Sequence, residues 1–200
     1  MILYGRNLSP YVRRVAVWLG LQGRAFETRP LATAEDFEAI LATNPVGRVP
    51  TLELDDGTRL IEAWAICDWL DDAAPERRLV PAAGPARRET LQRLALASAT
   101  ADKAVALVYD RNRRPEALHW ADWIARLTRQ VAGGLAAMEA VAPEAGFFGG
   151  DAPDGADVGF VCAFDFIGVM HPEIAGGPYP RLAALSARAN ALASFADTRP

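Results

Sequence analysis

The chain has 200 residues, of which 51% are hydrophobic and 23% are charged, and a formal net charge of −4. This composition is typical of a folded globular protein, and the length suits one large domain or two small ones. A net negative charge argues against a protein that binds nucleic acid by neutralising phosphates, and no apolar run of about 18 residues predicts a membrane span. The two cysteines are too few for a disulfide framework and have no neighbours at metal-ligand spacing, so we expect a cytoplasmic protein without a metal.

The first third of the chain alternates between strand and helix patterns. Residues 1–4 form a short apolar run that Gly5 ends, and Pro10 suits the first turn of a helix whose apolar residues recur to about residue 20. We then expect a strand at 25–29, a helix at 35–41, a hairpin of strands at 51–54 and 58–61, and a helix at 63–72. The order β-α-β-α-β-β-α predicts a small α/β domain with a mixed sheet.

The rest of the chain carries helix patterns alone. Prolines and glycines cluster between residues 75 and 85, as is typical of a linker. We expect helices at 86–110, 115–141, 154–170 and 180–192. The third of these is apolar on nearly every side, which predicts a central helix buried on all its faces. The predicted organisation is an α/β domain at 1–78, a linker at 79–85 and an all-α domain at 86–200.

Three segments carry more information than composition does. They read NLSPYVR at 7–13, NPVGRVPTL at 44–52 and LIEA at 60–63. In this order, ahead of an all-helical region, they resemble the cytosolic glutathione S-transferase family, and the first is similar to its serine-type bacterial members. The resemblance covers essentially the whole chain. It implies a thioredoxin-like first domain that binds glutathione as co-substrate, an all-α second domain, and a homodimer.

Pro50 marks a special main-chain position, because a proline that heads a strand removes one donor from the ladder. A cis Val49–Pro50 bond would turn the chain so that the N–H and C=O of Val49 face a ligand and pair with it as an added strand does. In the family, the cysteinyl unit of glutathione docks on the residue before this proline. An ordinary turn proline is the alternative, and we predict the cis bond.

Ser9 stands at the amino end of the first expected helix, where unpaired N–H groups and the helix dipole favour an anion. A free thiol has a pKa of about 8.5, and a hydroxyl that donates a hydrogen bond to the thiolate lowers it. With the resemblance, Ser9 is the residue expected to activate the thiol of glutathione. A serine here is otherwise simply a helix N-cap, and Asn7 is the second candidate for the thiol contact.

Further ligand contacts are implied by the resemblance. Glu62 would face the γ-glutamyl amine, while Ala63 stands where the family usually has a hydroxyl residue, so that only its N–H remains for the γ-glutamyl carboxylate. Arg48 is a candidate for the glycyl carboxylate, with a solvated surface arginine as the alternative. Asp102 resembles the position that reaches the γ-glutamyl amine of the partner subunit, with a solvated helix face as the alternative.

The second substrate is expected on the helix at 86–110. Its residues Asp102, Ala106 and Tyr109 share a face, and we expect Ala106 and Tyr109 to form, with Tyr11, the pocket for a small electrophile. Other residues have structural expectations: Asp154 and Asp157 form a variant of the capping box, the cysteines are buried, and the histidines are surface residues. These histidines are His119 and His171.

The sequence thus predicts an enzyme that transfers glutathione to a small, largely apolar electrophile, as detoxification requires. Two alternatives stay open. One is a glutathione-dependent isomerase or peroxidase on the same site. The other is a non-catalytic protein-interaction module of the stringent-starvation type, which the missing hydroxyl at position 63 favours a little, because fold does not fix function.

Overall fold

The computed structural model describes all residues from 1 to 200, and they divide into two compact units. The α/β unit comprises Met1–Gly84 and Asn190–Pro200, and the helical unit comprises Pro85–Ala189. None of the helices is long and apolar enough to cross a membrane.

A four-stranded mixed sheet in the order β2-β1-β3-β4 forms the centre of the α/β unit. The strands are β1 (Ile2–Tyr4), β2 (Glu27–Arg29), β3 (Thr51–Glu53) and β4 (Arg59–Ile61). β1 runs parallel to β2 and antiparallel to β3, and β3 and β4 form the expected antiparallel hairpin. Leu3 and Leu52 face each other across the central pair, and both are fully buried. The predicted order of elements is therefore confirmed.

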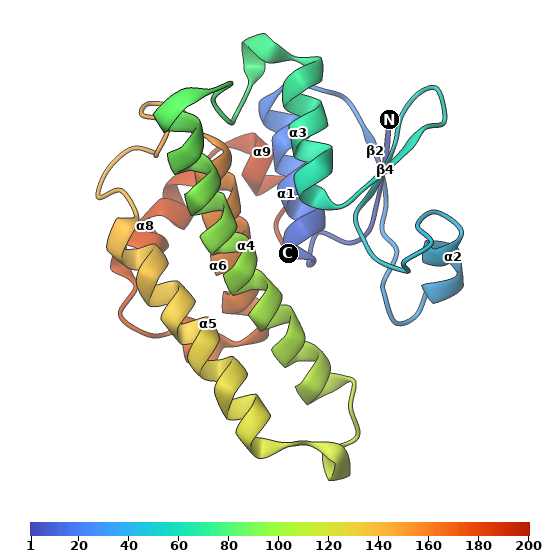
Figure 1. Cartoon of the computed structure of the whole chain (residues 1–200), viewed down its shortest axis with the longest axis vertical. Helices are drawn as coiled ribbons and strands as arrows, with labels where there is room; N and C mark the ends of the chain where they lie inside the picture. Colours follow the sequence, from blue (N-terminus) through green and yellow to red (C-terminus); the bar gives the residue numbers. More distant parts are fainter. The chain divides into compact units, whose positions relative to one another are not determined.

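Four helices complete the α/β unit. They are α1 (Pro10–Leu21), α2 (Phe37–Leu41), α3 (Ala63–Ala73) and α9 (Ala193–Ala196), and a short 3-10 turn at Pro75–Arg77 follows α3. α1 packs against both α3 and α9, and Figure 1 shows α1 and α3 side by side. α1 supplies the crossover that the parallel pair β1–β2 requires.

Asp71, buried near the end of α3, links α3 by hydrogen bonds to α1 and to the chain that follows α3. Its carboxylate accepts hydrogen bonds from Trp18 Nε1 at 2.8 Å and Gln22 Nε2 at 3.0 Å, both on α1. It also accepts from the N–H groups of Leu79 at 3.0 Å and Val80 at 2.8 Å. The expected linker therefore begins as a docked part of the α/β unit.

The C-terminal segment differs from expectation, since we placed all residues after 86 in the all-α domain. Asn190–Pro200 belongs instead to the α/β unit, because α9 packs on α1. Phe195 is fully buried there. Arg13 of α1 donates to Asn190 Oδ1 at 2.8 Å and to the carbonyl of Phe195 at 3.3 Å.

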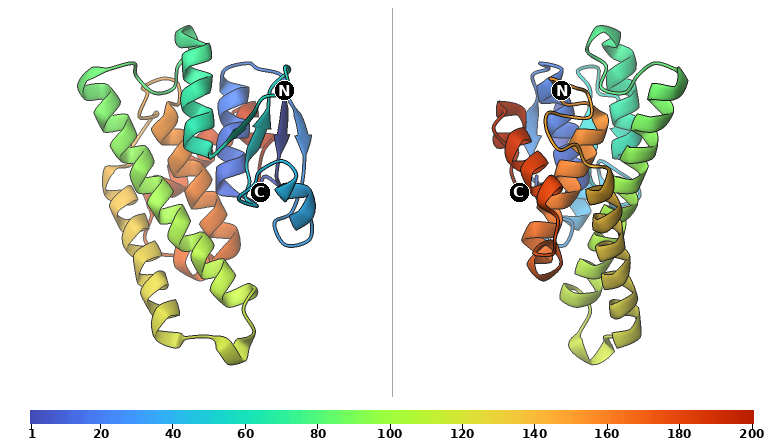
Figure 2. Two further views of the ribbon diagram at one scale, coloured as in Figure 1. Left: turned by 45° about the vertical axis from the view of Figure 1, so that its right-hand side comes forward. Right: turned by 90° about the vertical axis from the view of Figure 1, so that its left-hand side faces the viewer.

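The helical unit contains five helices. They are α4 (Gly84–Asn112), α5 (Ala121–Val141), α6 (Gly155–Met170), α7 (Pro172–Ala175) and α8 (Pro180–Ala189). α4 and α5 form a long antiparallel hairpin (Figure 2). α5 begins later than predicted, because the segment after Pro115 forms a 3-10 turn at Glu116–Leu118. α6 is buried along most of its length, as its apolar sequence predicts.

The amino end of α6 is closed by the expected capping box, which is confirmed. Asp154 accepts hydrogen bonds from the N–H groups of Ala156 at 2.7 Å and Asp157 at 3.2 Å. Asp157 accepts from the N–H of Asp154 at 2.9 Å and from those of Phe148 and Gly149 in the preceding loop. Burial raises the pKa of Asp157 to about 7, against the effect of these donors. The pair serves folding of the helical unit.

Candidate functional site

The candidate site begins in the loop between β1 and α1. Gly5 follows β1 with a φ of +122°, and a Cβ on it would lie 2.5 Å from Val12 Cγ2 and 3.0 Å from Val49 Cβ. Only glycine tolerates this backbone and this close approach. The loop is thereby held against Val49, and the N–H of Ser9 donates to the carbonyl of Arg6 at 2.9 Å to close a turn before the helix.

Ser9 is the N-cap of α1. Its backbone is extended, with φ −68° and ψ 123°, and its Oγ accepts a hydrogen bond from the N–H of Val12 at 3.4 Å. Pro10 occupies the first helical position, where no N–H is needed. The hydroxyl acts as an acceptor in this cap, so its proton remains available for an acceptor in front of the helix. The capping role and a thiol-binding role are thus compatible at one side chain.

Val49 offers main-chain groups to a ligand. The Val49–Pro50 bond is cis, as predicted. Neither the N–H nor the C=O of Val49 forms a hydrogen bond within the chain, whereas Thr51, two residues later, already pairs with Tyr4 in the sheet. An extended peptide can pair with both groups of Val49.

Asn44 shapes the turn that precedes Val49, a role that the sequence analysis did not assign. Its side chain is buried, donates from Nδ2 to the carbonyl of Arg48 at 2.9 Å and accepts at Oδ1 from the N–H of Val46 at 3.0 Å. The signal was present in the sequence, because an asparagine followed by Pro-x-Gly favours a turn that the side chain stabilises.

Glu62 precedes α3 with a φ of +66°, and it is the only non-glycine residue of the chain with a positive φ. Such a backbone costs energy in an L-residue and points to a position fixed by function. The side chain does not cap α3; instead, its Oε1 lies 3.3 Å from Nη1 of the partly exposed Arg48. Ala63 is buried at the first position of the helix. Arg48 and Glu62, which the resemblance assigns to opposite ends of glutathione, thus form an ion pair with each other.

The second-substrate candidates belong to different units. Tyr11 lies half-buried on α1 of the α/β unit, while Asp102, Ala106 and Tyr109 lie along α4 of the helical unit. Asp102 and Tyr109 are exposed and Ala106 is partly exposed, so their shared helix face is open to ligands or to another chain. Their roles remain predictions.

The histidine expectation was wrong for one of the two residues. His171 is only 1% exposed, and its Nε2 lies 2.9 Å from the carbonyl oxygen of Ala104. Its Nδ1 lies 3.5 Å from Nη1 of Arg111. His171 thus links the end of α6 to α4 inside the helical unit. A lone histidine in the sequence gives no sign of such a buried contact. Both cysteines are buried, as expected.

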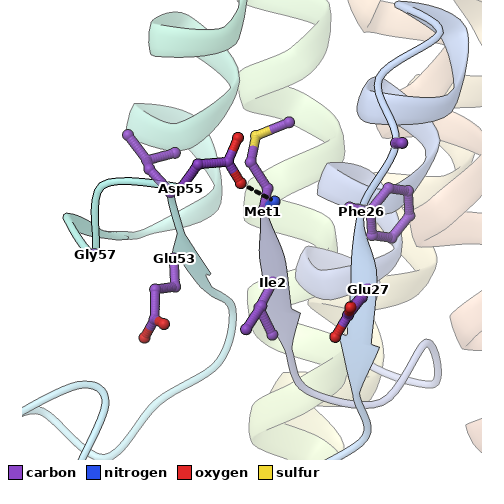
Figure 3. Close-up of a pocket in the computed structure, with 9 residues that line it drawn as sticks. Met1, Ile2, Phe26, Glu27, Glu53, Asp55 and Gly57 are labelled. Carbon is purple, nitrogen blue, oxygen red and sulfur yellow. Dashed lines mark hydrogen bonds and ion pairs between the residues drawn. The ribbon is translucent and has the colours of Figure 1, made fainter.

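A separate pocket opens at the opposite end of β1. It has a volume of 560 Å³ and is lined by Met1, Ile2, Ala25, Phe26, Glu27, Glu53, Leu54, Asp55 and Gly57 (Figure 3). The amino group of Met1 binds Asp55 at 2.6 Å. Hydrogen bonding by Arg59 holds the pKa of Glu53 below its usual range. Ser9 follows the carboxyl end of β1, whereas this pocket is built around its amino end, so the two are distinct.

Comparisons with known proteins agree with this geometry. The chain matches the family model of the glutathione S-transferase N-terminal domain over residues 3–78 and that of the C-terminal domain over residues 121–188. It is 31% identical over 175 residues to maleylacetoacetate isomerase from Pseudomonas aeruginosa, covering 78% of this chain and 74% of that protein.

Solved structures are similar over the whole chain. A glutathione S-transferase from Methylobacterium radiotolerans, in complex with glutathione sulfonate, matches with a TM-score of 0.93 and 28% identity, covering all of this chain and 94% of the other. One from Methylobacillus flagellatus with glutathione bound has a TM-score of 0.90 and 28% identity, covering all of this chain and 98% of the other. Both family models and a relative that covers most of the chain therefore show that the chain belongs to the glutathione S-transferase family.

Proposed function

We propose that the protein is a glutathione transferase, which binds glutathione at the turn before β3 and activates its thiol at the amino end of α1. One observation carries the proposal: Val49, with its unpaired N–H and C=O, is held by Gly5 against the loop that ends at Ser9. A tripeptide that pairs with Val49 as an added strand brings its central residue, the cysteine, to the start of the helix.

The charged ends of glutathione fit the ion pair beside this turn. When Arg48 turns to the glycyl carboxylate and Glu62 to the γ-glutamyl amine, one protein ion pair is exchanged for two with the ligand. The N–H of Ala63, in the first turn of α3, is available for the γ-glutamyl carboxylate because the first N–H groups of a helix lack an internal acceptor. Pro50 fixes the turn on which these contacts depend.

Thiol activation is assigned to Ser9 and the helix that it caps. The Oγ–H donates to the sulfur, and the positive end of the helix dipole also favours the thiolate. The thiolate then attacks an electrophilic carbon, a C–S bond forms, and the leaving group departs with its electron pair while the thiol proton goes to solvent. Tyr11, Ala106 and Tyr109 are the proposed contacts of the electrophile.

An isomerase is the second candidate, because maleylacetoacetate isomerase is among the relatives that cover most of this chain. In such a reaction the thiolate would add to one carbon of a cis double bond, the resulting single bond would rotate, and elimination would return both the trans alkene and the thiolate. Ser9 would have the same task, and glutathione would not be consumed.

Two measurements test these proposals. Calorimetry with glutathione tests binding; absence of binding would contradict both enzymes and favour the non-catalytic interaction module. Incubation with 1-chloro-2,4-dinitrobenzene and, separately, with a cis-alkene diacid tests the chemistry. A transferase consumes one glutathione for each product, whereas an isomerase forms product while the glutathione concentration stays constant.

We also propose a homodimer built mainly from α3 and α4. Trp64 on α3 is 68% exposed and Leu91 on α4 is 40% exposed. Large apolar side chains at such positions favour an interface, and two-fold dimers are the commonest assemblies. In this dimer Asp102 of one subunit would reach the γ-glutamyl amine bound to the other.

A further inference from the structure

The end of the α4–α5 hairpin carries no buried side chain. Leu107 is the last buried residue of α4 and Leu127 is the first of α5, and every residue from 108 to 126 is at least partly exposed. Tyr109, which is 48% exposed, belongs to this stretch. Since few buried apolar contacts hold such a segment, the position of the last turn of α4 depends on polar contacts.

Arg111 makes polar contacts between this turn and the rest of the helical unit. Its Nη1 donates to Glu173 Oε1 on α7 at 2.6 Å, and its Nη2 donates to Thr128 Oγ1 on α5 at 3.4 Å. Nη1 also lies 3.5 Å from Nδ1 of His171. The Nε2 atom of His171 lies 2.9 Å from the carbonyl oxygen of Ala104, which can only accept, so Nε2 carries the proton and Nδ1 is an acceptor.

The partners of Arg111 are themselves well fixed. His171 is 1% exposed and ends α6, and its carbonyl accepts hydrogen bonds from the N–H groups of Ile174 and Ala175 on α7. Hydrogen bonding by Arg111 holds the pKa of Glu173 below its usual range, so this carboxylate is charged at neutral pH. A planar guanidinium presents several N–H groups in fixed directions, which suits acceptors on different elements.

Tyr109 lies on the other side of the turn that Arg111 holds. Residues two apart in a helix point about 200° apart around its axis, so Tyr109 points away from the contacts that Arg111 makes. Asp110, between them, connects the turn to α5, because it accepts hydrogen bonds from Trp123 Nε1 at 2.8 Å and from Arg114 Nε at 2.9 Å. The connection to the junction of α6 and α7 comes from Arg111.

We propose that Arg111 is a positioning residue for the electrophile, because it fixes the last turn of α4 and thereby the place where Tyr109 presents its ring. The inference rests on the proposed function and adds a residue to it. Arg111 itself contacts neither glutathione nor the electrophile. Without Arg111 the turn samples more positions, and the contact between Tyr109 and the electrophile is formed for less of the time.

The test uses two ligands, glutathione and S-(2,4-dinitrophenyl)glutathione, the conjugate that forms from 1-chloro-2,4-dinitrobenzene. The ratio of their dissociation constants, measured by calorimetry, isolates the contribution of the aryl group. Arg111→Met should weaken binding of the conjugate about fivefold, the worth of one aromatic contact, and leave glutathione binding unchanged. Arg111→Lys should have an intermediate effect, because an ammonium group cannot reach all three acceptors. Arg113→Met removes an exposed arginine of the same hairpin and is the matched control, with both constants unchanged.

A double-mutant cycle separates positioning of Tyr109 from a general loss of structure. If Arg111 acts through Tyr109, Arg111→Met has no further effect in a Tyr109→Ala background, and the double variant binds the conjugate as tightly as Tyr109→Ala does. In turnover of 1-chloro-2,4-dinitrobenzene, Arg111→Met should raise the KM for this electrophile, with kcat and the KM for glutathione unchanged.

The possible failures are distinguishable. If Arg111→Met has no effect on conjugate binding, or the same effect with and without Tyr109, the role of Arg111 is refuted and the proposed function stands. Equal weakening of glutathione and the conjugate would assign Arg111 to the fold. If Tyr109→Ala binds the conjugate as tightly as the wild type, the proposed electrophile contact is wrong and the inference falls with it. If the wild type binds no glutathione, the proposed function itself is refuted.

Discussion

Ser9 has two hydrogen-bonding tasks at one oxygen in the proposed enzyme. As a cap it accepts from the N–H of Val12, and as a catalytic residue it donates its proton to sulfur. Because the long 3.4 Å contact to Val12 is a weak cap, a substitution of Ser9 should affect chemistry more than folding.

Ser9→Ala should therefore lower kcat by on the order of 10², the usual cost of removing one donor to a developing or resting anion. Glutathione affinity should change little, since the proposed contacts of the peptide frame are with Val49 and the charged residues and not with Ser9. The thiol pKa on the enzyme should rise toward its free value, which ultraviolet titration measures. An unaltered titration would transfer the thiol contact to Asn7 or to the N–H groups of the helix.

Ala63 is the one position where the chain departs from the family pattern within the proposed glutathione site. In the proposed complex, the γ-glutamyl carboxylate would have one protein donor fewer, and water would supply the missing hydrogen bond. Ala63 is buried at the first turn of α3, so a hydroxyl there would be close to the helix end that favours an anion.

Ala63→Ser should tighten glutathione binding by about 1–2 kcal/mol, the range of a hydrogen bond to a charged group after desolvation. The dissociation constant and the KM for glutathione should fall together, while kcat stays constant because this contact is equally present before and during the reaction. Calorimetry and steady-state kinetics measure both quantities, with Ala65→Ser on the same helix as control. Unchanged or weaker binding would mean that glutathione is held differently.

At the scale of elements, a single carboxylate links α1, α3 and the chain that follows α3. Asp71 binds α1 through Trp18 and Gln22, and it binds the chain after α3 through two backbone N–H groups. An amide at this position would place an NH₂ group against other donors, so a nearly isosteric replacement is disruptive.

Asp71→Asn should reduce the free energy of unfolding by about 2–4 kcal/mol, since hydrogen bonds to a charged group are worth more than neutral ones and the donors left behind are buried. Urea denaturation measures the loss. Asp72→Asn is the matched control, because its side chain is exposed on the same helix turn. Equal stability of the two variants would show that the four donors do not require the charge.

Most elements were predictable because their signals are local. Pro10 and Ser9 define the start of α1, and the alternation around a Gly-containing turn defines the β3–β4 hairpin. The start of α5 was not predictable, because Pro115 is equally suited to precede the 3-10 turn that forms there. α9 was missed because four residues carry no periodicity; only its packing on α1 makes it a helix.

In the candidate site and its surroundings, too, residues in local motifs were predictable and residues defined by tertiary contacts were not. Ser9, Val49 and Glu62 were found because they stand in short motifs, whereas Asp71 of the neighbouring helix was not singled out. A sequence cannot show that one aspartate of α3 accepts hydrogen bonds from four donors. This property arises from contacts between residues far apart in the chain, which composition and spacing do not encode.

At the scale of the whole molecule, the proposed homodimer determines whether the site is complete within one chain. Sedimentation at micromolar concentration should give a dimer, and Trp64→Glu should give a monomer by placing a charge in the two-fold interface. Asp102→Asn should weaken glutathione binding several-fold in the dimer and leave it unchanged in the Trp64→Glu monomer, because Asp102 acts on the neighbouring subunit. A wild-type monomer would refute the dimer and remove Asp102 from the site. Equal effects of Asp102→Asn in both forms would place the residue in its own subunit's site.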